Sequence, residues 1–259
     1  MATIRDWSNF IAGRTALITG AGGGVGRAIA IQMARAGAHL WVNDLHLDRA
    51  EKVCAEIEAE RLTAWPVVAD VTDRDAVIAM HVTTGPVDIL VNNAGIPVEG
   101  FPIKSFVETG PEEWDPLIRL NLAAVLNVTR TYLPGMIEHR WGRVLTIVSD
   151  AGRRGERKQV VYGAAKAAAM GFSRGLAAEV GRDGVTVNCI ALGTMKHGQM
   201  AEALDADPAL EAKLARAYPA GRVGTPADPA PLAVLLCSDA GEWITGQVYP
   251  VDGGYAPAL

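Results

Sequence analysis

Short apolar runs alternate along the chain with longer stretches in which apolar residues recur at helical spacing. The short runs are rich in β-branched residues and are apolar throughout, which is typical of parallel strands buried on both faces. Predicted strands span residues 15–19, 39–43, 63–68, 89–92, 143–148, 186–191 and 247–251. Predicted helices span residues 24–36, 47–60, 74–81, 112–140, 160–181 and 228–237. This order predicts an α/β fold with a Rossmann-type, doubly wound, seven-stranded parallel sheet and helices on both faces.

One region interrupts this regular alternation. Residues 194–222 contain two short helical patterns separated by Asp207-Pro208, between the sixth strand and the helix that follows. Connections at the carboxyl edge of such a sheet often carry binding loops, so we expect a small helical lid there. No linker, low-complexity segment or repeat divides the chain, and we predict a single domain over residues 1–259 with this lid as an insertion.

Composition narrows the possible functions. The chain has 259 residues, of which 49% are hydrophobic and 20% charged, which excludes a disordered protein. Its net charge of −5 gives no support for binding to nucleic acid or to an anionic membrane. Cys54, Cys189 and Cys237 are spaced too widely for a zinc or redox motif, so we predict no metal site. With no signal-peptide pattern and no long apolar run, we expect a soluble, cytoplasmic protein.

A glycine-rich turn follows the first predicted strand. It reads Thr19-Gly20-Ala21-Gly22-Gly23-Gly24-Val25-Gly26 and leads into a helix, an arrangement that exposes backbone N–H groups to a pyrophosphate. Asp44 ends the second strand eighteen residues past Gly26, near the spacing expected for a carboxylate that binds ribose hydroxyls. The same carboxylate would repel a 2′-phosphate, and no lysine or arginine lies in the turn. We therefore predict NAD(H) rather than NADP(H).

Tyr162 and Lys166 lie one helical turn apart at the start of the helix after the fifth strand. A free tyrosine has a pKa near 10, so a base near neutral pH requires stabilisation of the phenolate by roughly 4 kcal/mol. Ser149 ends the fifth strand and could donate a hydrogen bond to a substrate oxygen in the same crevice. A triad hydrolase is disfavoured, because no Gly-x-Ser-x-Gly motif surrounds Ser149.

With further motifs in the expected order, these residues resemble the short-chain dehydrogenase/reductase family from about Gly13 to Gly254. The matching segments are Thr19-Gly20-x-x-x-Gly24-x-Gly26, Asp70-Val71, Asn92-Asn93-Ala94-Gly95, Asn121, Ser149, Tyr162-x-x-x-Lys166, Asn188-x-Ile190, Ile244-Thr245-Gly246-Gln247 and Asp252-Gly253-Gly254. Each motif is weak alone, but their number and order are typical of this family.

The resemblance implies a role for each matched position. Tyr162 would transfer the proton as hydride moves, Lys166 would bind the nicotinamide ribose and lower the tyrosine pKa, and Ser149 would hold the substrate oxygen. Asn121 would hold a water that links Lys166 to solvent. Cofactor contacts would come from Gly20, Gly24, Val25, Gly26, Asp44, Asp70, Val71, Asn92, Ala94, Gly95, Tyr162, Lys166, Gly193 and Thr194. Substrate contacts would come from Ser149, Ala151, Arg153 and Gln159.

Three departures from the family pattern stand out. The Pro-Gly after the sixth strand is Leu192-Gly193, and the threonine that helps to bind the carboxamide falls at His197, so Thr194 or the backbone would replace it. The stretch 70–85 is shorter than expected by about one helical turn. Residues 150–158, expected as a loop, carry four basic side chains. That basic segment is either a solvated or subunit-interface cluster, or a recognition site for an anionic substrate such as a carboxylate or an acyl thioester.

These features predict an NAD-dependent short-chain alcohol dehydrogenase or ketone reductase, with a 3-oxoacyl thioester or another anionic ketone as candidate substrate. Two alternatives remain open: a catalytically inactive NAD-binding regulator or scaffold, and a dehydratase or epimerase that uses bound NAD. The helices 112–140 and 160–181 are apolar around more of their circumference than one sheet contact needs. We therefore expect a homo-oligomer, a dimer or the tetramer common in the family.

Overall fold

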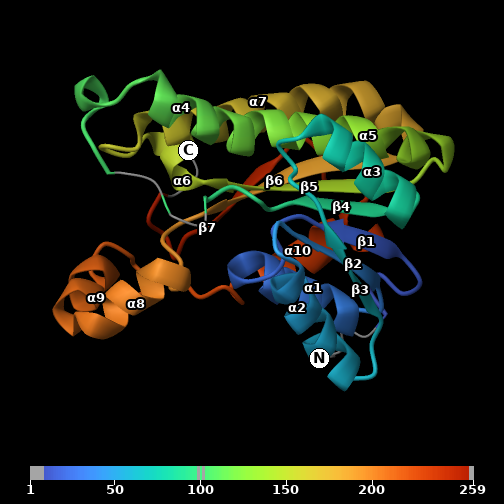
Figure 1. The fold of residues 1–259 in the computed structure, drawn as a ribbon, viewed down its shortest axis with the longest axis horizontal. Coiled ribbons are helices and arrows are strands. Elements are labelled where there is room, and N and C mark those ends of the chain that lie inside the picture. Colours follow the sequence, from blue (N-terminus) through green and yellow to red (C-terminus); the bar gives the residue numbers. More distant parts are fainter. Residues whose placement is uncertain (1–8, 98–99, 101–102, 257–259) are drawn as a thin grey trace.

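The computed structural model describes residues 9–97, 100 and 103–256. Its seven strands form one parallel sheet in the order β3-β2-β1-β4-β5-β6-β7, which confirms the predicted fold class (Figure 1). The strands are β1 (Thr15–Ile18), β2 (His39–Asp44), β3 (Ala64–Val68), β4 (Ile89–Asn92), β5 (Gly142–Ser149), β6 (Val185–Leu192) and β7 (Val248–Val251). Because β1 pairs with both β2 and β4, the strand order reverses there and a crevice opens at the carboxyl edge.

The helices match the predicted positions closely. They are α1 (Gly24–Arg35), α2 (Leu47–Ala59), α3 (Arg74–Thr84), α4 (Pro111–Ile118), α5 (Ala124–Glu138), α6 (Asp150–Arg154), α7 (Val160–Val180), α8 (Gly198–Ala206), α9 (Pro208–Ala215) and α10 (Ala230–Leu236). Short 3₁₀ turns lie at Phe106–Glu108, Gly181–Asp183 and Asp239–Gly241. No helix in the described part of the chain is long and apolar enough to cross a membrane.

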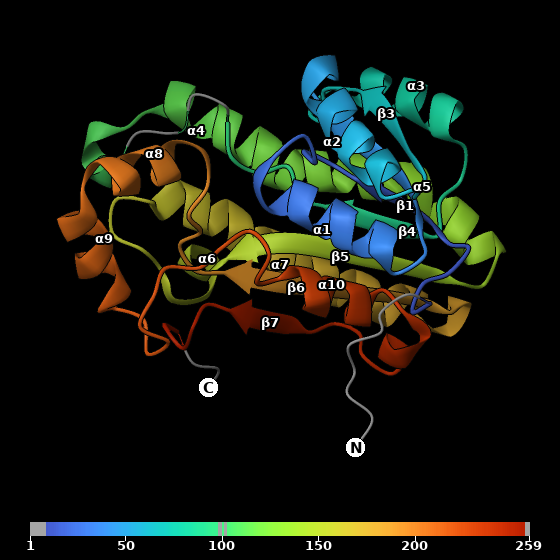
Figure 2. The same cartoon turned by 90° about the horizontal axis from the view of Figure 1, so that it is seen from below.

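Helices cover both faces of the sheet and enclose two main cores. On one face α1, α2 and α10 pack against the strands, and on the other α3, α5 and α7 do so (Figures 1 and 2). Ile29 and Met33 of α1 and Tyr132 and Met136 of α5 are almost fully buried in these layers. Strands β5 and β6 each pair with a strand on both sides and are buried along most of their length, as expected for unbroken apolar runs.

Two segments differ from the prediction. The single helix expected over residues 112–140 consists of α4 and α5 joined by a π-helical turn, Arg119–Ala123. A wide turn inside a helix leaves no trace in apolar spacing, since both flanking helices keep the same buried face. Residues 150–154 form the short helix α6 rather than a loop, because Ser149 caps it by accepting a hydrogen bond from the Ala151 N–H.

The lid between β6 and α10 has the predicted two helices. Helix α8 ends at Ala206, and Asp207 caps α9 by accepting the N–H groups of Ala209 and Leu210 at 3.0 and 3.1 Å. Pro208 occupies the first position of α9, where its missing N–H is not needed. The lid stands away from the sheet at its carboxyl edge (Figures 1 and 2).

Candidate active site

The glycine turn leads into the N-terminus of α1 at the switch point of the sheet. Helix α1 starts at Gly24, no described side chain caps it, and its first turn holds no acidic residue. The open N–H groups and the positive end of the helix dipole therefore suit an anion, and they fit the diphosphate of a dinucleotide. Gly20, Gly24, Val25 and Gly26, which the resemblance implies as cofactor contacts, lie in this turn and in the first turn of α1.

The end of β4 braces this turn. Asn93 Nδ2 donates to the carbonyls of Thr19 and Gly20 at 2.9 and 3.0 Å, while Thr19 Oγ1 accepts the N–H groups of Asn93 and Ala94. The Asn92 side chain, predicted to lie along the cofactor, donates instead to Thr129 Oγ1 of α5 at 3.0 Å. The Asn92 side chain therefore bonds to α5, while the Asn93 side chain joins the segment after β4 to the glycine turn after β1.

Asp44 is buried beside the same turn. Its Oδ2 accepts the Gly22 N–H at 3.1 Å and its Oδ1 accepts the His46 N–H at 3.2 Å, so the carboxylate is fixed by two backbone donors. Arg49, in the first turns of α2, places a guanidinium nitrogen 3.6 Å from Asp44 Oδ1 and lies over Gly22 and Gly23. The sequence analysis missed Arg49. Its position five residues past Asp44, near the start of the next helix, is the signal that could have found it.

Asp70 and Val71 follow β3. The exposed Asp70 carboxylate accepts the N–H and hydroxyl of Thr72 at 2.8 and 2.7 Å, which holds the turn before α3. Val71 is buried in the core beneath it. Both lie at the carboxyl edge next to β2, the side of the crevice where the predicted adenine contact would be made.

Tyr162 and Ser149 meet at the other side of the crevice. Their side chains are hydrogen-bonded to each other. Ser149 Oγ also accepts the Ala151 N–H at 3.2 Å, so its single hydroxyl proton can be donated either to the Tyr162 oxygen or to the oxygen of a bound molecule. Burial raises the pKa of Tyr162 to about 12 even though the Ser149 hydrogen bond lowers it. The protein by itself therefore keeps the tyrosine protonated, in a state suited to donate a proton.

Lys166 lies one helical turn beyond Tyr162 and is also buried. Its Nζ donates to the Ile147 carbonyl of β5 at 2.9 Å and lies 5.8 Å from the centroid of the Tyr162 ring. Burial lowers the Lys166 pKa to about 8. A buried ammonium close to a phenol stabilises the phenolate form of that phenol.

Asn121 completes this cluster from the π-helical turn. Its Nδ2 donates to the Leu117 carbonyl at 2.9 Å, which leaves its buried Oδ1 without a hydrogen-bond partner among the described residues. Gly95 lies close against both side chains: a Cβ there would lie 2.5 Å from Lys166 Nζ and 2.9 Å from Asn121 Oδ1. The two polar atoms therefore lie next to the same glycine, and Asn121 Oδ1 can accept a hydrogen bond from the predicted water.

Helix α6 places a charged cluster directly behind Ser149. Arg153 donates to Asp150 at 2.8 Å and lies 3.7 Å from Asp252, while Asp150 Oδ2 is buried with no donor among the described residues. Burial raises the Asp150 pKa to about 6, and the neighbouring Asp252 adds to that rise. Arg153, a predicted substrate residue, thus forms ion pairs with two carboxylates. Ala151, the other predicted substrate residue on α6, is buried against Tyr162.

Gln159 caps the start of α7 and lines a small hollow of about 30 Å³ beside Tyr162. Phe106 and Trp114, whose rings stack with centroids 5.2 Å apart, line its far side. Gln159 and Tyr162 therefore line the same hollow.

The segment after β6 begins with Leu192-Gly193, where the family pattern has Pro-Gly. Thr194 gives its N–H to the hydroxyl of Tyr218 at 2.9 Å, and its carbonyl accepts the Gly224 N–H at 3.0 Å. The Thr194 backbone is therefore occupied by the lid's returning segment, and only its side chain remains for a cofactor contact. Gly193 packs against Tyr218 and Asp252, where a Cβ would come within 3.0 Å of the tyrosine ring.

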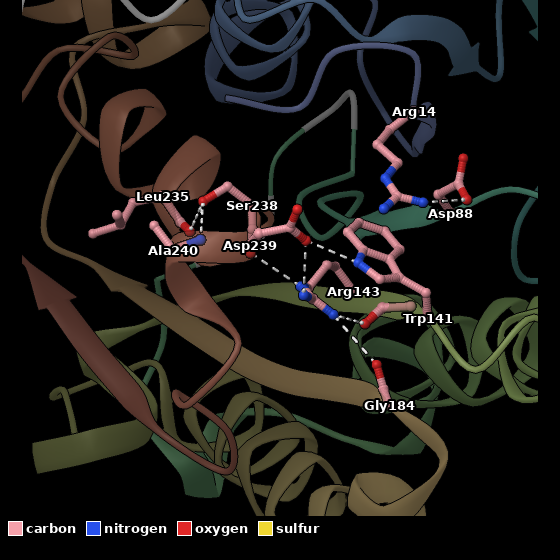
Figure 3. Close-up of polar contacts among 10 residues, drawn as sticks. Arg14, Asp88, Trp141, Arg143, Gly184, Leu235, Ser238, Asp239 and Ala240 are labelled. Carbon is pink, nitrogen blue, oxygen red and sulfur yellow. Dashed lines mark hydrogen bonds and ion pairs between the residues drawn. The ribbon is translucent and has the colours of Figure 1, made fainter. Parts of the chain in front are cut away.

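A separate cavity of about 240 Å³ opens at the amino edge of the sheet, away from these residues. There Arg14 and Arg143 lie over the Trp141 ring at 3.6 and 4.2 Å, and Trp141 Nε1 donates to Asp239 (Figure 3). The buried Arg143 also donates to the carbonyls of Gly142, Gly184 and Ser238. Since its donors are satisfied within the fold, Arg143 clamps loops together rather than offering a reactive group.

The arrangement matches a family model described as enoyl-(acyl carrier protein) reductase over residues 20–256. The chain belongs to the short-chain dehydrogenase/reductase family. Enzymes of this family are oxidoreductases that use a nicotinamide cofactor on small molecules, and the chain belongs to that class of enzyme.

Similar proteins come from several bacteria. A solved 3-oxoacyl-[acyl-carrier protein] reductase from Brucella melitensis with bound NAD is 34% identical, with a TM-score of 0.88 and coverage of 97% of this chain and 95% of that one. A gluconate 5-dehydrogenase from Burkholderia cenocepacia with NADP and tartrate is 32% identical, with a TM-score of 0.87 and coverage of 98% and 99%. A Xanthobacter autotrophicus relative named inactive 2-(S)-hydroxypropyl-CoM dehydrogenase 2 is 39% identical and covers 85% of this chain and 96% of its own.

Proposed function

We propose that the protein is an NAD(H)-dependent oxidoreductase that interconverts a secondary alcohol and a ketone, with Tyr162 as the acid/base. The observation that carries this proposal is the set of Ser149, Tyr162 and Lys166 at the crevice of the sheet, with Ser149 hydrogen-bonded to the tyrosine and Lys166 buried beside it. A nicotinamide bound there would exchange hydride with the substrate carbon.

The chain's own residues handle the proton. Ser149 donates to the substrate oxygen and fixes it near the Tyr162 hydroxyl. In the reductive direction Tyr162 gives its proton to that oxygen, and Lys166 stabilises the phenolate left behind. The proton is then replaced through Lys166 and a water held by Asn121 Oδ1, whose hydrogen-bonding capacity is unused among the described residues. In the oxidative direction the same steps run backwards.

Asp44 supports NAD(H) as the preferred cofactor. A carboxylate fixed by the Gly22 and His46 N–H groups can accept the two ribose hydroxyls and repels a 2′-phosphate. Arg49 offsets part of that repulsion, because its guanidinium lies 3.6 Å from the Asp44 carboxylate. We therefore propose a preference for NAD(H) that is limited in size rather than absolute, and this agrees with relatives that carry either cofactor.

The substrate we propose is a ketone or alcohol with an anionic group, a 3-oxoacyl thioester included. The names of the structural neighbours support this class, since one is a 3-oxoacyl-[acyl-carrier protein] reductase and the other holds tartrate. Arg153 would attract the anionic group of the substrate electrostatically while it stays paired with Asp150 and Asp252. Arg153→Ala should raise KM for an anionic ketone more than for its neutral ester, and equal KM values in variant and wild type would contradict this assignment.

We also propose a homo-oligomer in the cytoplasm. Helices α4, α5 and α7 each carry an exposed apolar side chain, namely Ile118, Leu126 and Val160. A second copy of the chain could cover these side chains. The three cysteines are unpaired and buried, which agrees with a reducing compartment.

A second candidate function is a dinucleotide-binding protein without turnover, which the relative named inactive favours. A panel of secondary alcohols, hydroxy acids and 3-oxoacyl thioesters, tested with NAD(H) and NADP(H) by the change in nicotinamide absorbance, separates the two. Turnover of any member supports the enzyme. Tight NADH binding without turnover across the whole panel would support the inactive protein instead.

A further inference from the structure

His197 occupies a position in the lid that brings it onto the phosphate-binding turn. It precedes α8 directly and forms the N-cap of that helix. Its imidazole packs on Gly24, where a Cβ would lie 2.9 Å from His197 Nδ1. Gly24 has a φ of +52°, so glycine is favoured there both by the backbone and by the closeness of the imidazole. A ring nitrogen from the lid therefore lies over the N-terminus of α1.

The lid also reaches the opposite wall of the crevice. Gln199, two residues further along, approaches Gly100 in the segment after β4, where a Cβ would lie 3.0 Å from Gln199 Oε1. The start of the lid thus makes two contacts. His197, just before α8, touches the phosphate turn, and Gln199, in α8, touches the segment after β4. A molecule lying along the turn would have the His197 imidazole beside its phosphates.

Several charged residues on the elements around His197 form ion pairs with one another. On the lid, Lys196 pairs with Asp205 and Glu211, both at 2.9 Å. On α1, Arg27 pairs with Glu56, and on α2, Arg49 pairs with Asp44. Burial lowers the pKa of His197, so the imidazole is neutral near pH 7 when no anion is present.

We propose that His197 binds the cofactor diphosphate and so couples closure of the lid to binding of the dinucleotide. This inference rests on the proposed function, and it gives the lid a residue-level role at the phosphates in place of a threonine contact to the carboxamide. The N–H groups at the start of α1 hold one side of the diphosphate, and the imidazole holds the side that faces the lid.

Contact between the His197 imidazole and the diphosphate would link binding of the dinucleotide to uptake of a proton. An anion next to the imidazole favours its charged form, which raises the His197 pKa in the complex above its value in the free protein. Since the complex then binds more protons than the free protein, affinity for the dinucleotide rises as the pH falls. Between the two pKa values the dissociation constant should change by up to about tenfold per pH unit.

The test measures dissociation constants for NADH and ADP-ribose by titration calorimetry between about pH 6 and about pH 8. Adenosine, which has no phosphate, is the control ligand. His197→Ala should weaken both diphosphate ligands about tenfold at the lower pH and much less at the higher pH, and should leave adenosine unchanged. His197→Asn keeps a hydrogen-bond donor without a titratable group, so it should restore part of the affinity and remove the pH dependence.

Different failures have different meanings. If the wild-type protein binds neither NADH nor NADPH at any pH, the proposed function is wrong and this inference falls with it. If the wild type binds NADH and both variants bind it equally well with the same pH dependence, only the role of His197 is wrong. An equal loss of adenosine binding in His197→Ala would show a general disturbance of the crevice and would also overturn the inference.

Discussion

Lys166 Nζ of α7 and Asn121 Oδ1 of the π-helical turn both lie close against Gly95, within 2.5 and 2.9 Å of where a Cβ would stand. The two side chains come from helices on the same face of the sheet, and Gly95 follows β4. The π-helical turn is what brings Asn121 to this place, because the extra residue in the turn rotates it relative to a regular helix. Together these residues form the inner end of the proposed proton path.

Gly95→Ala should therefore block the proton path while leaving the fold in place. The added Cβ would come within 2.5 Å of Lys166 Nζ and displace any water beside Asn121 Oδ1. We expect kcat to fall at least about tenfold, with a loss of stability of roughly 1–3 kcal/mol from overpacking. Steady-state kinetics and chemical denaturation measure the two effects separately.

Gly171→Ala is the matched control for that variant. Gly171 lies on the exposed side of α7, and a Cβ there meets no heavy atom within 4 Å. Alanine should stabilise the protein by about 0.4–1 kcal/mol and leave kcat unchanged. Wild-type kcat in Gly95→Ala would show that the close approach of Lys166 and Asn121 to this glycine plays no part in catalysis.

Asp44 and Arg49 should have opposite effects on cofactor preference. Removing the carboxylate in Asp44→Ala leaves Arg49 to attract a 2′-phosphate, so NADPH should bind better than NADH. Arg49→Ala removes the charge that offsets Asp44, so its preference for NADH should exceed that of the wild type by about threefold or more. Fluorescence titration with both cofactors measures each ratio. A wild-type protein that binds NADPH more tightly than NADH would contradict the assignment of Asp44.

The buried pair Asp150 and Asp252 predicts a pH-dependent stability. The Asp150 pKa is raised from 3.8 to about 6, so its contribution to stability is fully present below pH 3.8 and is lost as the pH rises through about 6. Asp150→Asn resembles the protonated acid and can donate to Asp252. The variant should be more stable than wild type near pH 8, by up to about 3 kcal/mol, with a smaller difference near pH 5.

Asp228→Asn provides the comparison of opposite sign. The hydrogen bonds from Arg222 lower the Asp228 pKa to about 2, so its stabilising effect is present at neutral pH and is lost as the pH falls toward 2. Asp228→Asn should destabilise the protein at neutral pH by about 1 kcal/mol or less, since the pair lies near the surface. Thermal melts across this pH range test both variants, and a constant offset for Asp150→Asn at every pH would contradict the predicted titration.

The sequence predicts the sheet and its helices well, because buried parallel strands and amphipathic helices have distinct apolar spacing. Even the division of the lid at Asp207-Pro208 is visible, since a capping aspartate before proline marks the start of a helix. The π-helical turn around Asn121 and the short helix after Ser149 are not visible. Both depend on local hydrogen bonds, and neither changes which residues are apolar.

The candidate site was predictable as a set of residues but not as a set of contacts. The motifs locate Tyr162 and Lys166, but they do not show that Asn92 turns toward Thr129 or that Arg153 pairs with Asp252. Arg49 joins the site only because α2 begins beside the glycine turn. Such contacts depend on how elements pack against one another, and one sequence without structure does not fix them.

Tyr162→Phe tests the central claim most directly. Phenylalanine keeps the buried ring and removes the hydroxyl that hydrogen-bonds Ser149, so the fold and cofactor binding should persist. With a substrate that the wild type turns over, we expect kcat to fall by at least about 100-fold while the dissociation constant for NADH stays within about twofold of the wild-type value. Retention of wild-type kcat in a correctly folded Tyr162→Phe protein would contradict the assignment of Tyr162 as the acid/base.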